Sequence, residues 1–136
     1  MKQKMNPVVH FELPAEDKKR MVDFYTTVFG WQTQILGPEM GNYVVVTTTE
    51  VDEKTHFPKE PGRINGGLYE KNPSMGATQP TVVIAVDDIK EHMQKVTAAG
   101  GKIVSGPDDI PGIGVYAAFT DTEGNRIAML QPLPMT

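Results

Sequence analysis

Two side chains near the start of the chain have the types and the spacing for acid–base chemistry or ligand contact. In segment 8–13 (VVHFEL), His10 and Glu12 alternate with apolar residues, which predicts a strand that carries both on one face. An imidazole with an unperturbed pKa of about 6.5 can act as a general base or as a plain hydrogen-bond partner. The alternatives are a hydrogen-bonded core histidine or a dimer-interface residue for His10, and a rim or interface charge for Glu12.

A helix is expected directly after this strand. Asp17 is placed to cap it, and Gly30 follows the last apolar pair, where a left-handed residue ends a helix. Between them, apolar residues recur at helical spacing and form one stripe, which we expect to pack on the sheet. The stripe consists of Met21, Phe24, Tyr25, Val28 and Phe29.

The remaining chain predicts further strands and a second helix. The strands are expected at 32–36, 42–49, 64–70, 80–86, 102–105, 115–120 and 126–131. The second helix begins after Asp88, carries an apolar stripe of Ile89, Met93 and Val96, and is stopped by the pair Gly100-Gly101. Segments 50–62 and 106–114 are expected to be loops, and 71–79 has the composition of a linker.

The order of these elements repeats. Strand–helix–strand–strand–strand occurs twice, and Asp17 and Asp88, like Gly30 and Gly101, are 71 positions apart. Neither repeat is expected to bury its sheet alone, so the two share a core or exchange halves with a second chain. We expect one domain over 1–136, with modules at about 6–70 and about 80–132. Alternation in the strand expected at 80–86 places Val82, Ile84 and Val86 under the second helix. The residues between them, Thr81, Val83 and Ala85, then lie on a cavity face. Thr81 is the counterpart of His10 in the repeat.

Composition excludes several classes of protein. The 136 residues include no cysteine, which excludes disulfides and thiolate metal sites and fits a cytoplasmic location. A net charge of −4 without a basic patch argues against nucleic-acid binding. No apolar run reaches about 18 residues and no secretory signal is present, so no membrane partner is expected.

Three segments give the chain a resemblance to a known family. They are VVHFELPAEDKKRMVDFYTTVFGW, VVIAVDDIKEHMQKVTAAGGKI and AAFTDTEGNRIAMLQP. In this order they resemble the vicinal oxygen chelate superfamily, which includes glyoxalase I, extradiol dioxygenases and bleomycin resistance proteins. The resemblance implies an α+β fold in which two βαβββ modules form a curved mixed β-sheet around a cavity. It does not imply one reaction, because this scaffold supports several chemistries.

The resemblance also identifies four positions that hold a divalent ion in metal-dependent members. Here they are occupied by His10, by Gly66 or Gly67, by Thr81 and by Ala128. Glycine and alanine have no donor atom, so we expect no metal and no other cofactor. A rearranged site that uses Glu12, Glu70 or the loop residue His56 is the alternative.

The expected function is binding of a small organic molecule in the sheet cavity, similar to the antibiotic-sequestering members. The residues expected to contact the ligand are His10, Asn65, Gly66, Gly67, Thr81 and Ala128, with a β-bulge as the alternative role of the glycine pair. The other hypothesis is a lyase, isomerase or dioxygenase-like enzyme, with His10 and Glu12 as catalytic residues. The resemblance also implies a homodimer, because in this family a second chain or an exchange of halves commonly completes the cavity.

Overall fold

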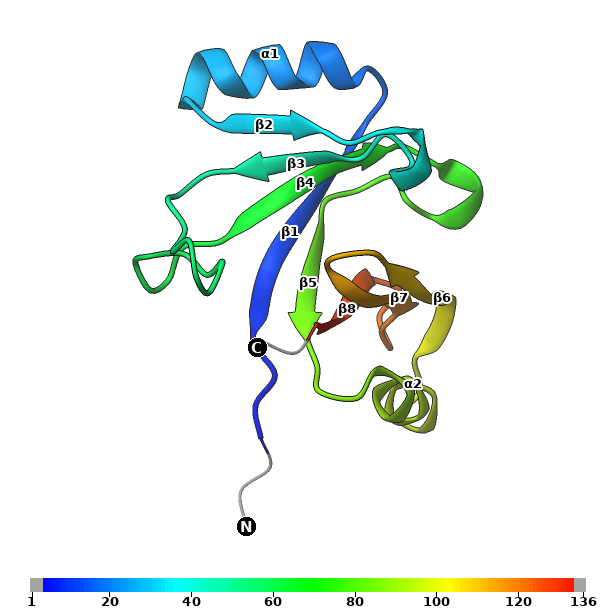
Figure 1. The fold of residues 1–136 in the computed structure, drawn as a ribbon. Helices are drawn as coiled ribbons and strands as arrows, with labels where there is room; N and C mark the ends of the chain where they lie inside the picture. Colours follow the sequence, from blue (N-terminus) through cyan, green and yellow to red (C-terminus); the bar gives the residue numbers. More distant parts are fainter. Residues whose placement is uncertain (1–3, 134–136) are drawn as a thin grey trace. The chain divides into compact units, whose positions relative to one another are not determined.

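The computed structural model describes residues 4–133, which form two compact units (Figure 1). One unit comprises residues 10–80, and the other comprises residues 4–9 together with 81–133. Each contains one helix of ten or more residues and a mixed sheet, with strand order β2-β3-β4-β1 in the first and β6-β7-β8-β5 in the second. In both sheets the last two strands of this order are parallel and the other pairs are antiparallel. The predicted α+β class and the βαβββ repeat are therefore confirmed.

The first unit follows the predicted order of elements closely. Its strands are β1 (Val8–Ala15), β2 (Gln32–Ile35), β3 (Val44–Thr47) and β4 (Asn65–Glu70), and its helix is α1 (Lys18–Phe29). Asp17 accepts a hydrogen bond from the Arg20 amide at 3.0 Å, and Gly30 ends the helix with φ 72°. The cap residues predicted from the sequence are those that the structure uses.

The sheet of the first unit has two unlike faces. On one face, Val44, Val46 and Leu68 are buried and pack with Phe11, Leu13, Met21, Val22 and Trp31. Because side chains alternate along a strand, His10 and Glu12 lie on the opposite face, as the sequence predicted. The helix thus covers one face, and the polar residues of β1 occupy the other.

The apolar stripe of α1 is only partly used for this packing. Met21 contributes to the core, but Phe24, Val28 and Phe29 each expose more than half of their surface. The expectation that the whole stripe packs on the sheet is therefore wrong. The helix instead packs through Met21 and Val22, and its Tyr25 ring stacks parallel to the ring of Trp31, just beyond the helix, at 4.5 Å.

The second unit is built on the same plan. Its strands are β5 (Thr81–Ala85), β6 (Lys102–Ile110), β7 (Gly114–Thr120) and β8 (Arg126–Pro132), and its helix is α2 (Ile89–Ala98). The Asp88 carboxylate caps α2 by accepting from the Glu91 amide at 3.1 Å. The core under the helix consists of Ile84, Val86, Ile89, Met93, Val96, Val115, Ala117, Phe119 and Met129. Val82, expected under the helix, is instead exposed, because β5 meets this core only through Ile84 and the residue after the strand.

One predicted loop belongs largely to a strand. Segment 106–114 was expected to be a loop rich in Pro and Gly, but β6 continues to Ile110 and pairs with β7 through two register shifts. Gly106 makes this possible, because a Cβ there would lie 2.6 Å from the Tyr116 carbonyl oxygen and 2.8 Å from the Ala117 Cα. Its φ of 95° also lies where side chains are rarely tolerated.

The other connections are short or irregular. Two 3₁₀ turns lie at η1 (Pro38–Met40) and η2 (Pro73–Met75), the second within the predicted linker. Segment 50–62 is a loop, as predicted, and holds one isolated bridge between Val51 and Pro58. Among residues 4–133, neither helix has the length and apolar composition needed to cross a bilayer.

Candidate ligand-binding site

Three side chains of the first unit are joined by hydrogen bonds on the sheet face opposite α1. The Tyr43 hydroxyl donates to Glu12 Oε2 at 2.9 Å and lies 3.2 Å from His10 Nε2. Glu12 is only 7% exposed, so its carboxylate depends on hydrogen bonds to remain in place. The structure therefore brings together the two residues that the sequence singled out, and it adds Tyr43 between them.

The bond from Tyr43 to Glu12 determines the tautomer of His10. A phenol has one proton, and because Tyr43 gives it to Glu12, its oxygen can only accept from His10. His10 then carries its proton on Nε2 and keeps the lone pair on Nδ1, an atom for which residues 4–133 supply no hydrogen bond. Burial lowers the pKa of His10, and the nearby Glu12 charge offsets this only partly, so the ring is neutral at neutral pH.

The glycines of β4 differ in what they contact. Gly67 is paired with Glu12 across the parallel β1–β4 register, and a Cβ on Gly67 would overlap the Tyr43 hydroxyl. Gly66 lies on the other face, where a Cβ would come within 2.6 Å of the Phe11 ring. Of the two registers left open by the sequence, Gly67 is thus the position that shares a face with His10.

Asn65, a third candidate from the sequence, has a structural task. Its side-chain oxygen accepts from the Thr48 amide at 2.7 Å and from the Thr49 amide at 3.1 Å. These bonds hold the end of β3 against the start of β4. The amide NH₂ group of Asn65 makes no hydrogen bond to residues 4–133 and remains available to a ligand.

The remaining candidates belong to the second unit. Thr81 is 3% exposed and Ala128 is fully buried. Ala128 lies between Val83 of β5 and Ala118 of β7, and all three point away from the core under α2. The alternation predicted for Thr81 and Val83 agrees with this arrangement.

The four positions that hold a metal ion in related proteins do not fit one here. Such an ion needs three or more nitrogen or oxygen ligands at about 2.0–2.2 Å. At position 67 the space for a side chain is occupied by the Tyr43 phenol, and Ala128 has no donor atom. Across the described residues, no three His, Asp or Glu side chains come together as a metal site. Glu70 and His56, the alternative ligands, are exposed.

Tyr43 is the residue that sequence reasoning missed. It stands just before β3 and 31 positions from Glu12, so nothing local connects the two. The available signal was the glycine pair in β4, since a strand glycine often marks the close approach of another group. The register needed to identify Tyr43 as that group comes only from the β3–β4 pairing.

Two βαβββ units, each with a mixed sheet and one helix, define an α+β protein with a polar sheet face in its first unit. The chain belongs to the Glyoxalase/Bleomycin resistance protein/Dioxygenase superfamily, whose family model matches residues 8–129. The family expected from the sequence is therefore confirmed.

Individual relatives carry different functions. The chain is 30% identical to the anthracycline biosynthesis protein DnrV of Streptomyces peucetius over 88% of its own length and 44% of that protein. It is 31% identical to a glyoxylase-like domain-containing protein of Didymella fabae, over 87% of this chain and 88% of the other. The solved methylmalonyl-CoA epimerase from Mycobacterium tuberculosis has the same fold, with a TM-score of 0.61 at 13% identity, over 93% of this chain and 88% of that one. The chain thus spans less than half of the first of these relatives.

Proposed function

We propose that this protein binds a small organic molecule on the His10 face of its first unit, without a metal ion, as sequestering members of the family do. The observation that carries the proposal is the Tyr43 phenol over Gly67, where metal-dependent relatives have a ligand. His10 Nδ1 and the Asn65 NH₂ group supply polar contacts on this face. A few directed polar groups beside apolar surface are typical of small-molecule sites.

Thermal denaturation with candidate ligands tests this proposal. The anthracycline doxorubicin and the dicarbonyl methylglyoxal are suitable probes, the first because a relative serves anthracycline biosynthesis. A ligand at 100 times its dissociation constant raises the free energy of unfolding by about 2.7 kcal/mol. The proposal predicts a shift that His10→Ala reduces and that His56→Ala, in an exposed loop, leaves unchanged. Stoichiometric zinc, nickel or iron in protein purified without chelator would contradict the metal-free part.

A second function is favoured by the tautomer of His10. A neutral imidazole with a free Nδ1, held by Tyr43 and Glu12, has the form of a general base. It would take a proton from a carbon next to a carbonyl group and return it, which is an isomerase reaction. Methylmalonyl-CoA, the substrate that the name of a structural neighbour gives, is a suitable carbon acid. Exchange of its acidic proton in D₂O, abolished by His10→Gln, separates this enzyme from a binding protein.

We further propose that the protein is a cytoplasmic homodimer. The support for a dimer is the exposed apolar surface of α1, formed by Phe24, Val28 and Phe29. Contiguous exposed apolar patches of a few hundred Å² commonly mark interaction surfaces. The support for the cytoplasm is the absence of cysteine from the sequence, which a reducing compartment favours.

A further inference from the structure

The strand pairing of the first unit places four polar residues in one row across the sheet. His10 of β1 is paired with Asn65 of β4, and Gln32 of β2 is paired with Thr47 of β3. The β3–β4 register, with Val46 opposite Gly66, places Thr47 opposite Asn65. All four alternate with residues of the α1 side, so they share the face of His10. No spacing in the sequence indicates this row, because each member comes from a different strand.

The row has unused hydrogen-bonding groups and a defined length. The Thr47 hydroxyl and the Gln32 amide make no side-chain hydrogen bond to residues 4–133, and neither does the Asn65 NH₂ group. Neighbouring strands are about 4.8 Å apart, so His10 and Thr47 are separated by two strand spacings, or about 10 Å. A ligand that reaches both must be longer than a single small ring.

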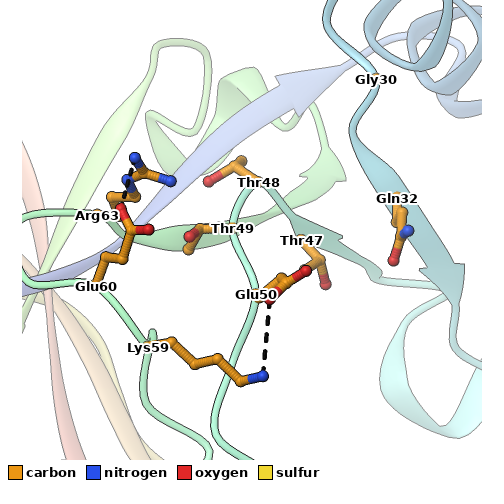
Figure 2. Close-up of a pocket in the computed structure, with 9 residues that line it drawn as sticks. All are labelled: Gly30, Gln32, Thr47, Thr48, Thr49, Glu50, Lys59, Glu60 and Arg63. Carbon is orange, nitrogen blue, oxygen red and sulfur yellow. Dashed lines mark ion pairs between the residues drawn. The ribbon is translucent and has the colours of Figure 1, made fainter.

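At its β2–β3 end the row opens into a pocket. The pocket has a volume of about 480 Å³, and Figure 2 shows its lining side chains, which come from β2, β3 and the loop that follows β3. The polar lining residues are Gln32, Thr47, Thr48, Thr49, Glu50, Lys59, Glu60 and Arg63. No aromatic side chain lines it, in contrast to the ring-lined sites that bind flat apolar molecules.

The charges of the pocket are balanced. Lys59 pairs with Glu50 at 3.7 Å, and Arg63 pairs with Glu60 at 2.6 Å (Figure 2). Two cations beside two anions create little net potential, so neither an anion nor a cation is drawn in. Hydroxyl, amide and paired ionic groups instead offer donors and acceptors side by side, which suits a ligand whose groups both donate and accept.

We propose that this pocket is a second subsite, which binds the neutral, polyhydroxylated part of a ligand whose other end contacts His10. The proposal rests on the proposed binding function and names its ligand class: a sugar or polyol joined to a ring system. The Thr47 hydroxyl, the Gln32 amide and the Asn65 NH₂ group bind the hydroxyls nearest the ring. Lys59, Glu50, Arg63 and Glu60 bind those farther along, without breaking their ion pairs.

Four probes, three aryl compounds and one methyl glucoside, test the proposal on the full ¹⁵N-labelled chain by NMR titration. They are 4-nitrophenol, 4-nitrophenyl β-D-glucoside, 4-nitrophenyl phosphate and methyl β-D-glucoside. We expect the aryl glucoside to bind more tightly than 4-nitrophenol or the phosphate, and to shift the amide signals of residues 47–49 and 65. Thr47→Val removes one hydroxyl without changing shape and should weaken glucoside binding about fivefold, as the loss of one hydrogen bond does.

Thr33→Val is the matched control. Thr33 is paired with Val46 and lies on the opposite face of β2, so its replacement should leave glucoside binding unchanged. Equal effects of the two substitutions, or tighter binding of the phosphate, would overturn the sugar subsite.

The same titrations separate the subsite from the proposed function. If 4-nitrophenol binds in a manner that depends on His10 but the glucoside gains nothing, the subsite is wrong and the proposed function stands. If the glucosides shift residues 47–49 while His10→Ala changes no affinity, the subsite stands and the His10 site is wrong. If none of the four probes shifts any signal, both are wrong.

Discussion

At the scale of single residues, the Tyr43 hydroxyl decides what the polar face of β1 can do. It donates to a buried carboxylate and accepts from an imidazole, so one oxygen orients both candidate functional groups. It also occupies the space where a side chain at position 67 would begin. A metal ligand at position 67 and this hydrogen-bonded trio are therefore mutually exclusive arrangements of the same strands.

Removing this hydroxyl should cost stability. Tyr43→Phe deletes a hydrogen bond to a charged acceptor, and we expect the free energy of unfolding to fall by about 1.5–3 kcal/mol in urea denaturation. Tyr25→Phe is the matched control, because no hydrogen bond joins the Tyr25 hydroxyl to residues 4–133. A clearly smaller loss is expected there. Equal losses of unfolding free energy in the two variants would contradict a stabilising Tyr43–Glu12 hydrogen bond.

The pKa of His10 makes a prediction about acid stability. Burial holds this pKa below 6.5, so between its folded value and 6.5 the unfolded chain binds more protons than the folded chain. The free energy of unfolding should therefore fall as pH drops through about 6.5, and the loss is complete below the folded pKa. His10→Gln keeps a polar partner for Tyr43 but does not titrate, and its stability should change less over this range.

His56→Asn provides the control for this pH series. His56 is exposed in the loop and has φ 64°, which asparagine tolerates, so the wild-type slope should persist. Asp52 and Asp121 have pKa values lowered by hydrogen bonds, mainly from the Thr55 amide and the Asn125 side chain. The stability that these two carboxylates contribute is lost only as pH falls below about 3.8, so it does not affect the slope near pH 6.5 that we assign to His10. Parallel pH curves for wild type and His10→Gln would contradict the buried neutral histidine.

The sequence was sufficient to find His10 and Glu12 but not their partner. Alternation along one strand places both on one face, and this needs no tertiary information. The position of Tyr43 beside Glu12 depends on how β3 pairs with β4. The row formed by Gln32, Thr47, Asn65 and His10 depends on the registers of three strand pairs. Such contacts between strands have no local signature in one sequence.

At the scale of elements, local signals predicted the helices better than the strands. Asp17, Gly30 and Asp88 mark helix ends through contacts within a few residues, and each acts in the structure as expected. The extent of β6 depends instead on its neighbour β7. Gly106 and Pro107 indicate a loop by composition, yet two register shifts allow β6 to continue past them.

The close approach of Gly106 to β7 can be measured by substitution. Gly106→Ala faces both a strained backbone, with φ 95°, and an approach of 2.6 Å to the Tyr116 carbonyl oxygen. Gly112→Ala has φ 77° but open space around it, so only the backbone strain applies. We expect Gly112→Ala to cost about 1–2 kcal/mol in urea denaturation and Gly106→Ala clearly more. Similar costs would mean that β6 shifts away from β7 without difficulty.

At the scale of the whole molecule, the exposed apolar side chains of α1 indicate an interaction surface. The sequence identified an apolar stripe correctly, but an apolar stripe does not say whether its partner lies in the same chain. Phe24, Val28 and Phe29 expose 54%, 54% and 60% of their surface, although Met21 of the same stripe packs on the sheet. An interface between two copies would bury these side chains, and each Å² of apolar surface removed from water stabilises the dimer by about 25 cal/mol.

The proposed dimer should therefore depend on this helix face. Phe24→Glu with Val28→Lys removes two exposed apolar side chains and creates an i, i+4 ion pair in the orientation that favours helices. We expect light scattering after size exclusion to show a dimer for wild type and a monomer for this variant, with α1 still folded. Lys90→Glu with Gln94→Lys makes the same pair on the exposed side of α2 and should leave the dimer intact. A wild-type chain that stays monomeric as its concentration rises would mean that α1 is not the interface between two copies.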